Sequence, residues 1–548
     1  MKQLVKIGVL CWLFFAQFAF QVQSQIDENK PLLFTDRGFC VSGDTIWLMY
    51  KVPVSIPTEN IVVRFQLETA GGSEIGSIAT ASAKGWAGGF LPVPDSLSSG
   101  HYFLTAFLLN QSVNQVFPIT KSLLVYNRFD EEITQLQICT STETSLSENK
   151  VGDIKIKTDK EIYNQREKVE ISFDLPAENE IAEAVVRATL IDSLEKKIAP
   201  GYSFDYKFAN APEPGFIEEN GFLITGKVKA VNGKIQPGVL VVISLPASGN
   251  YFDYCIADSS GTFHFFLKRA FGETDAIFQV FSGTEDRYQI ELENATLQRT
   301  GRLLTEPLLL SPFQTSFIRN ALSSSFANHV FYPGSVVNQR FFSMEAPDSI
   351  PFYGAPTLRI RPEEYFDLPD FREISRELLH GFQYRIRNEK IVFRMLNRTQ
   401  SEFFKEEPLR LINGIPVFDN QLFVALKSTE IEYIDLVLHE RVYGDLILNG
   451  VIEVSLKDKS DAWIGNQPNL FRRNITFLQP PGKTAVCKRV AKNSEPDTRQ
   501  VFLWEKIEGN PGVISIDLSD RKGIAEISVE GFTTGKKYFR TTKTIEIK

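Results

Sequence analysis

The residue types that most often carry catalytic or metal chemistry are sparse in this chain of 548 residues. Its five histidines, at positions 101, 264, 329, 380 and 439, include no pair with metal-ligand spacing. Residues 221–227 have the spacing of a phosphate-binding loop, but Val228 follows where Mg²⁺ binding requires Ser or Thr. The residues between the two glycines are mostly apolar and typical of a strand. We therefore expect no metal site and no cofactor.

Nucleophile motifs and paired carboxylates lead to the same expectation. Ser193 and Lys196 match the Ser-x-x-Lys spacing of penicillin-binding nucleophiles, but the Ser-Asp-Asn and Lys-Thr-Gly partners are missing. Adjacent glutamates occur at 363–364 and 406–407, whereas general acid and base pairs face each other across a cleft. We expect no catalytic residues and a protein that is not an enzyme.

The composition favours β-structure and excludes a nucleic-acid partner. Hydrophobic residues make up 43% and aromatic residues 12%, with 44 Phe against 4 Met. Short Val, Ile and Phe runs alternate with Gly, Pro and Asn, which is typical of strands and turns. The formal net charge is −8, and no dense stripe of Lys and Arg occurs along the sequence.

Residues 1–24 have the form of a secretory signal peptide. Lys2 and Lys6 precede an apolar stretch at 7–20, and a cleavage site follows Ser24. Spanning a bilayer takes ~20 residues, so this stretch is too short, and no later segment is a transmembrane candidate. We expect an exported protein in the periplasm or at the outer membrane, with the cell surface left open.

Four cysteines follow the signal peptide, and they are widely scattered. They are too few and too far apart to form a disulfide framework for a chain of this length. We expect buried free thiols on strands at Cys40, Cys139, Cys255 and Cys487, while the sequence leaves open that some of them pair in an oxidising compartment.

An internal repeat predicts two successive β-sandwiches. Residues 34–48 align without gaps to residues 157–171, and both copies begin with Thr-Asp and a basic residue. Asp36 and Asp159 stand at equivalent positions, where the carboxylate can bond to local backbone amides. An alternating strand follows in each copy. With Gly100 to Phe107, these motifs resemble the MG2-like domains of the alpha-2-macroglobulin family, which implies sandwiches at 25–128 and 150–210.

The following segments resemble other modules of exported Bacteroidetes proteins. The strands and the Asp258-Ser-Ser-Gly261 turn within 218–290 resemble the carboxypeptidase regulatory-like domain, a β-sandwich without an active site. Residues 291–350 lack a clear period, and we interpret them as a connecting segment with short helices. Residues 465–548 carry Pro496-Asp497-x-Arg499 and resemble the closing β-domain of these proteins.

Residues 351–460 resemble the plug domain of TonB-dependent outer-membrane receptors. The resemblance lies in strands at 408–412, 431–438 and 451–456, and in the Asn413-Gly414 turn. A helix is predicted at 371–380, with Asp370 as its N-cap and Glu373 three residues later. A 22-stranded barrel needs roughly 220 residues in strands, more than follow this segment. We therefore expect a plug-like domain without its own barrel.

Taken together, the expected fold class is mainly β, with tandem macroglobulin-like or Ig-like sandwiches and one small α/β plug-like domain. The expected function is that of a non-catalytic scaffold that docks to another envelope protein, such as an outer-membrane barrel. The alternative left open is an accessory subunit of a TonB-dependent nutrient-uptake receptor. Candidate partner-contact residues lie in two stretches of the plug-like domain: Asn413, Gly414, Asp419 and Asn420, and then His439, Glu440, Arg441 and Tyr443.

Overall fold

The computed structural model describes residues 31–548 apart from internal stretches, the longest at 110–117, 140–153, 192–203, 210–217, 332–341 and 480–494. The predicted signal peptide and Cys487 lie outside the described residues. The chain forms two compact units. Unit 1 comprises residues 1–207, 298–337 and 481–548, and unit 2 comprises residues 208–297 and 338–480.

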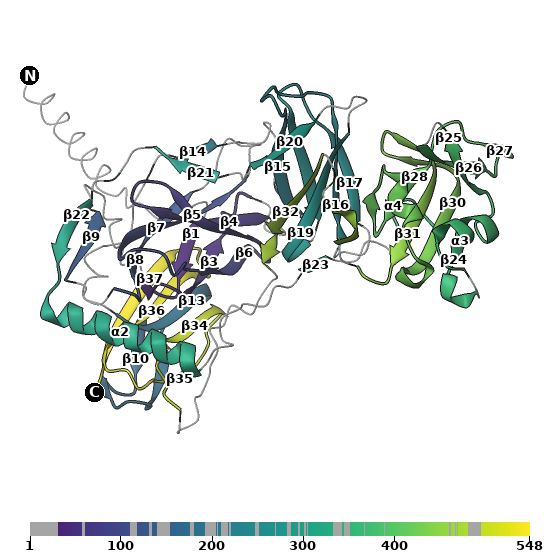
Figure 1. The fold of residues 1–548 in the computed structure, drawn as a ribbon. Helices are drawn as coiled ribbons and strands as arrows, with labels where there is room; N and C mark the ends of the chain where they lie inside the picture. The colour runs from purple at the N-terminus through teal and green to yellow at the C-terminus, as the bar shows by residue number, and fades with distance from the viewer. Residues whose placement is uncertain are drawn as a thin grey trace, which may run out of the picture. The chain divides into compact units, whose positions relative to one another are not determined.

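Unit 1 begins with a β-sandwich formed by one continuous stretch of the chain (Figure 1). Its two sheets bury Val, Leu, Ile and Phe between them, and two strands, β4 (Val62–Thr69) and β7 (Gly100–Leu108), are buried at consecutive positions, so both of their faces are covered. One sheet has the order β1 (Leu32–Thr35), β3 (Thr45–Lys51), β6 (Trp86–Pro92). The other includes, in order, β5 (Glu74–Ala81), β4 (Val62–Thr69), β7 (Gly100–Leu108), β8 (Ile119–Tyr126) and β2 (Phe39–Val41).

The second sandwich of unit 1 is assembled from two distant parts of the chain. Its sheets have the orders β10 (Lys155–Thr158), β12 (Lys168–Asp174), β35 (Ile514–Asp517), and β34 (Val501–Glu508), β13 (Ile181–Leu190), β36 (Gly523–Thr533), β37 (Tyr538–Ile547), β11 (Ile162–Tyr163). Strand by strand, this order repeats that of the first sandwich. The predicted domains at 150–210 and 465–548 therefore contribute strands to one sandwich instead of forming two.

The chain leaves the second sandwich at the position where the first sandwich has a hairpin. In the first sandwich, β4 and β5 are joined by a tight turn in which Thr69 N donates to Ser73 O at 2.9 Å. The equivalent strands β13 and β34 are separated by residues 191–500, yet Leu190 N still donates to Gln500 O at 3.0 Å. Both ends of the insertion thus meet at neighbouring ladder positions, next to a register shift between Ala188 and Thr189.

The internal repeat has the same hydrogen bonds in both copies. Asp36 N donates to Trp47 O at 3.1 Å, and Trp47 N donates to Asp36 Oδ1 at 3.0 Å. In the second copy, Asp159 N donates to Glu170 O at 3.3 Å, and Glu170 N donates to Asp159 Oδ1 at 2.9 Å. Each aspartate thus fastens the chain at the end of the first strand to the strand that pairs with it.

Residues 291–350 contain one long helix where short helices were predicted. This helix, α2 (Pro312–Phe331), packs Ile318 and Ala321 against Phe39 and Leu124 of the first sandwich (Figure 1). Two small sheets have two strands each: β9 (Gln135–Cys139) with β22 (Thr305–Leu309), and β14 (Tyr206–Ala209) with β21 (Thr296–Arg299).

Unit 2 begins with a third sandwich. Its first sheet has the order β18 (Thr262–Lys268), β15 (Gly221–Ala230), β20 (Tyr288–Glu293). Its second includes, in order, β17 (Tyr251–Ile256), β16 (Leu240–Leu245) and β19 (Ala270–Phe281), and β19 also pairs with β23 (Phe342–Met344), β32 (Leu470–Thr476) and β33 (Leu478–Gln479). Because β32 and β33 come after the plug-like segment, that segment is inserted into this sandwich.

The plug-like segment is a small α/β domain. Its main sheet has the order β24 (Leu358–Ile360), β30 (Ile431–Tyr443), β31 (Leu446–Leu456), β28 (Leu409–Ile412), β29 (Ile415–Pro416). A second sheet has the order β25 (Phe382–Arg387), β26 (Lys390–Asn397), β27 (Glu402–Phe403). The helices are α3 (Phe371–Glu377), α4 (Asn420–Val424) and three 3-10 turns, η2 (Pro362–Glu364), η3 (Ser428–Glu430) and η4 (Ala462–Ile464).

The predicted cap of α3 is confirmed. Asp370 Oδ1 accepts from Arg372 N at 3.0 Å and from Glu373 N at 3.1 Å. The helix ends at Glu377, three residues earlier than predicted, and Phe371 and Ile374 enter the core as expected.

The structure confirms the predicted fold class, since the described chain is mainly β. Cys40 and Cys139 are buried free thiols, as predicted, whereas the free thiol of Cys255 is only partly buried. Among the helices of the described chain, none combines the length and the apolar character needed to cross a membrane.

Candidate functional site

The predicted contact residues Asn413 and Gly414 have an internal, structural role. They form the turn between β28 and β29 with φ of +49° and +75°, as an Asn-Gly hairpin turn requires. Asn413 is 4% exposed; its Oδ1 accepts from Leu456 N at 2.8 Å and its Nδ2 donates to Asp458 O at 2.9 Å. A side chain with both ends engaged inside the domain is not available to a partner.

Asp419 and Asn420 also serve the domain itself. Asp419 caps α4 through a hydrogen bond from Gln421 N at 2.9 Å. Asn420 is buried, donates to Ile391 O and to Glu407 Oε1 at 2.9 Å each, and accepts from Arg410 at 3.0 Å. These contacts fix α4 to the sheets, and sequence alone does not separate such a role from an exposed loop.

The second predicted stretch lies at the end of the β30–β31 hairpin and is divided by strand alternation. Tyr443 points toward the third sandwich, where its hydroxyl donates to Phe252 O at 3.1 Å and its ring lies 5.9 Å from that of Tyr254. His439 Nε2 lies 3.1 Å from Thr357 Oγ1, and Arg441 Nη2 donates to Ala355 O at 3.4 Å. Of the eight predicted residues, Glu440 has an exposed side chain without an internal role, and it lies beside Val442 and Ile447.

Two large apolar side chains on the opposite face of this hairpin were missed by the sequence analysis. Val442 and Ile447 are direct cross-strand neighbours, and they are 70% and 64% exposed. Cross-strand pairs in an antiparallel ladder have Cβ atoms about 5 Å apart, so the two side chains form one apolar surface. The alternation of 439–443 would have indicated it, because Val442 must face away from Tyr443.

Farther along the same two strands, the main sheet of the plug-like domain contains two buried carboxylates. Asp435 on β30 and Glu453 on β31 are paired positions, and both are at most 1% exposed. Asp435 accepts a two-pronged ion pair from Arg359, with both N–O distances 2.6 Å. Glu453 Oε1 accepts from Gly414 N at 3.0 Å, whereas its Oε2 has no hydrogen-bond partner.

The buried position of Glu453 changes the pKa of its carboxyl. Burial raises the pKa of Glu453 to about 8, with the Gly414 amide acting against the shift and the charge of Asp435 adding to it. The side chain is therefore mainly protonated at neutral pH. A carboxyl with a raised pKa is typical of a general acid, but Glu453 is 0% exposed and cannot meet a substrate.

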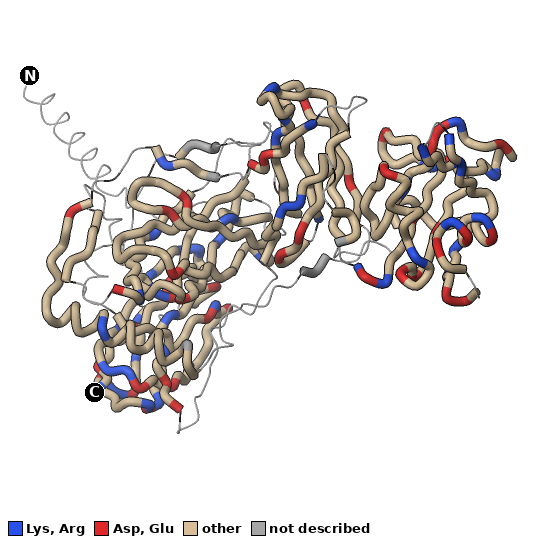
Figure 2. Tube along the Cα trace, viewed as in Figure 1, with Lys and Arg blue, Asp and Glu red and all other residues tan. Residues whose placement is uncertain are grey.

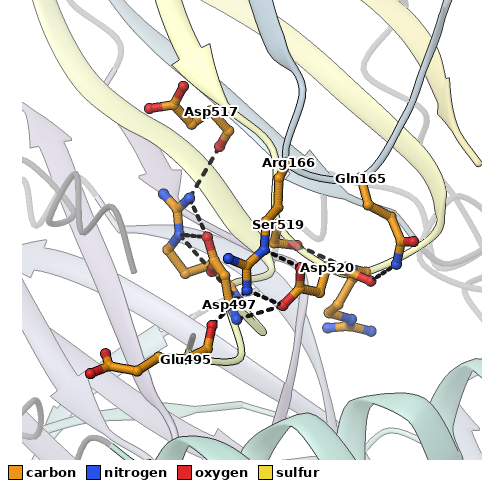
Figure 3. A network of polar contacts seen from close by, with 9 residues as sticks. Gln165, Arg166, Glu495, Asp497, Asp517, Ser519 and Asp520 are labelled. Atoms are coloured by element: carbon orange, nitrogen blue, oxygen red, sulfur yellow. Dashed lines mark hydrogen bonds and ion pairs between the residues drawn. The ribbon is translucent and has the colours of Figure 1, made fainter. Parts of the chain in front are cut away.

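In unit 1, a polar network closes the second sandwich around the Pro496-Asp497-x-Arg499 motif (Figure 3). Arg166 has φ of +58°, and its guanidinium contacts both oxygens of Asp520, with Nη2 to Oδ2 at 2.8 Å. Asp520 Oδ2 also accepts from Asp497 N at 2.7 Å, and Asp497 binds the Arg499 guanidinium at 2.6 Å. These contacts join the β11–β12 turn to the chain that returns from the insertion.

This network is structural, not catalytic. Each arginine is neutralised by a carboxylate within the cluster, and the hydrogen bond from Arg166 is the main reason that the pKa of Asp520 is lowered. In the part of the chain that the structure describes, no group of three His, Cys, Asp or Glu side chains is arranged to hold a metal ion.

Comparisons with known proteins do not place the chain in a family. No protein-family model matches the sequence, and no curated protein matches it. Solved structures similar to the chain include Escherichia coli alpha-2-macroglobulin activated by porcine elastase, at 9% identity and a TM-score of 0.21, covering 94% of this chain and 43% of that one. The native conformation of the Escherichia coli protein gives 8% identity, a TM-score of 0.23, and coverages of 95% and 40%. Salmonella alpha-2-macroglobulin reacted with methylamine gives 9% identity and a TM-score of 0.22, covering 94% of this chain and 39% of that one.

The chain spans less than half the length of each of these structures. Their TM-scores are too low to carry an argument about function. The chain is a mainly β, multidomain protein with repeated sandwiches, and its role has to be argued from its own residues.

Proposed function

We propose that this protein is a non-catalytic, exported scaffold of the bacterial cell envelope that docks to another envelope protein through the exposed end of the β30–β31 hairpin. The observation that carries the proposal is the cross-strand pair Val442 and Ile447, 70% and 64% exposed. Exposed apolar side chains that form one surface at the end of a rigid element are typical of docking sites.

The hairpin is well suited to present this surface. Tyr443 and Leu446 on its other face are partly buried and pack against a buried cluster that includes Tyr353, Leu411 and Val437. The end of the hairpin is therefore held in place, and a partner would lose little entropy in ordering it. Glu440 lies beside the pair and supplies a charged rim.

Burial of these two side chains gives an estimate of the expected effect. Full burial of a Val or Ile side chain contributes about 1.5–3 kcal/mol, so removal of both should weaken docking at least ~100-fold. Replacing them with aspartate would also place charge in an apolar interface, which adds to the loss.

The test is affinity purification of the tagged chain from cross-linked native envelopes, in the wild type and in the double variant V442D/I447D. The matched control is V513D/I524D in the second sandwich, where the side chains are 60% and 48% exposed. We expect one partner to be recovered with the wild type and the control, and lost with V442D/I447D. Purified partner and chain should reproduce this order of binding.

The identity of the partner decides the finer role. An outer-membrane barrel would make the chain an accessory subunit of an uptake receptor, whereas another soluble envelope protein would make it a general scaffold. Recovery of the same partner with V442D/I447D would overturn the proposed docking site, and turnover in a hydrolase panel would overturn the non-catalytic role.

A further inference from the structure

The β25–β26 ribbon of the plug-like domain separates its side chains by character. In the antiparallel register, Phe382 pairs with Met395 and Tyr384 with Phe393, and these rings and chains face the core. By strand alternation, the opposite face carries Arg385 and Arg387 on β25, and Lys390 and Arg394 on β26. Figure 2 marks Lys and Arg along this ribbon.

Among the described residues, no carboxylate forms an ion pair with the cations of this face. Arg385, Arg387 and Lys390 are exposed, and none has an ion pair in the described chain. Arg394 lies over the ring of Phe403 at 5.0 Å, not beside a carboxylate. On the neighbouring strand, Glu402 pairs with Asn397 and so points to the other side of the sheet from Phe403.

Other arginines of the same domain show the contrast. Arg359, Arg376 and Arg410 each have a carboxylate partner within 3.2 Å. The whole chain has a net charge of −8, so the ribbon gathers positive charge against the average of the protein. Neighbouring cations on one strand face stand about 7 Å apart, and those across the ladder about 5 Å apart, so their fields add.

The free end of the ribbon also exposes an apolar side chain. Ile386 is 66% exposed, lies between Arg385 and Arg387 in sequence, and pairs with Ile391. By strand alternation, Ile386 lies on the same face of the ribbon as Phe382 and Tyr384, so it is not part of the cationic face.

We propose that the outer face of the β25–β26 ribbon binds the surface of a bilayer that contains anionic phospholipid. Arginine suits this role because its planar guanidinium recognises phosphate oxygens. The exposed Arg385, Arg387 and Lys390 and the half-buried Arg394 give this face a positive charge that complements a layer of anionic headgroups. A folded acidic partner would need complementary acceptors at fixed positions, whereas a layer of mobile headgroups adjusts to the cations, which favours the bilayer surface.

This inference concerns a different surface and a different partner from the docking hairpin. Val442 and Ile447 are on the main sheet, and the ribbon belongs to the second sheet. The test below uses lipid vesicles and purified protein only, so its result does not depend on an envelope partner.

The experiment is co-sedimentation of the purified mature chain with vesicles of phosphatidylcholine, alone or mixed with phosphatidylglycerol. We expect binding to the mixed vesicles alone, weakening as salt is added. Each Lys or Arg near an anionic surface contributes roughly a fivefold factor, so R385E/R387E should lower binding at least ~25-fold. The milder R385Q/R387Q should give an intermediate loss.

The matched control is K155E/K168E, which changes the net charge equally at exposed lysines of the second sandwich. This variant should bind mixed vesicles within about twofold of the wild type, because the ribbon is intact. Circular dichroism of each variant checks that the fold is retained. Absence of wild-type binding at low salt, or equal losses in the ribbon and control variants, would refute the proposal. Binding to soluble polyglutamate without binding to vesicles would replace the lipid surface with an acidic polypeptide.

Discussion

Substitution of Glu453 by glutamine should make the plug-like domain more stable than the wild type, by an amount that grows as the pH rises. In the native state burial raises the pKa of Glu453 to about 8, whereas an unperturbed glutamate titrates near 4.5. A carboxyl whose pKa is raised by folding supports stability fully below the lower value and loses that support as the pH rises to the higher one. Between these values the unfolded chain releases a proton that the native chain retains.

The size of the effect follows from that interval. Each pKa unit corresponds to about 1.4 kcal/mol, so at pH 7 the wild type has lost roughly 3 kcal/mol relative to pH 4.5. Glutamine keeps the acceptor for the Gly414 amide and carries no charge at any pH. Glu453→Gln should therefore match the wild type near pH 5 and exceed its stability by a few kcal/mol near pH 8.

The assay is hydrogen exchange of peptides that cover β30 and β31, measured by mass spectrometry across this pH range with correction for intrinsic exchange. Local exchange is preferable because a chain with several domains does not unfold in two states. Glu432→Gln on the paired strand β30 is the control, since Lys459 lowers the pKa of Glu432 and this substitution should not remove the pH trend. Equal pH dependence in wild type and Glu453→Gln would refute the reasoning.

Three further predictions concern stability. Asp520→Asn should destabilise the second sandwich by about 1–2 kcal/mol in thermal unfolding, because Arg166 loses its ionic partner. Since folding lowers the pKa of Asp520, this contribution to stability should be present above pH ~4 and fade on acidification. The pH dependence of Tm should therefore be smaller in the variant than in the wild type. Asp370→Ala should cost the plug-like domain about 1 kcal/mol through loss of the α3 cap, measured by urea unfolding, with Asp370→Asn nearly neutral. Asn420→Ala should cost more, about 2–3 kcal/mol, since Ile391 O and Glu407 lose a buried donor; an effect no larger than that of Asp370→Ala would show that α4 is not fixed by these bonds.

Local patterns in the sequence were enough to predict the local elements. The repeat around Asp36 and Asp159 predicted two sandwiches because a carboxylate that bonds backbone amides eleven residues away is encoded within one short motif. The cap at Asp370 was predictable for the same reason. Alternation and turn chemistry likewise predicted a mainly β chain.

Relations between distant segments were decided by the tertiary structure alone. Nothing local in β13 shows that it pairs with β34, more than three hundred residues later, or that β32 completes the third sandwich. Such pairings depend on which edges remain open after the rest of the sheet has formed.

Exposure at the candidate sites was also decided at this level. Asn413 and Asn420 looked like loop residues and are buried, whereas Val442 and Ile447 looked like ordinary strand residues and are exposed. Arg385, Arg387, Lys390 and Arg394 form no stripe in the sequence and become one face only through the cross-strand register. A strand pattern defines which side chains share a face, but the packing of other elements determines whether that face is covered or meets a partner.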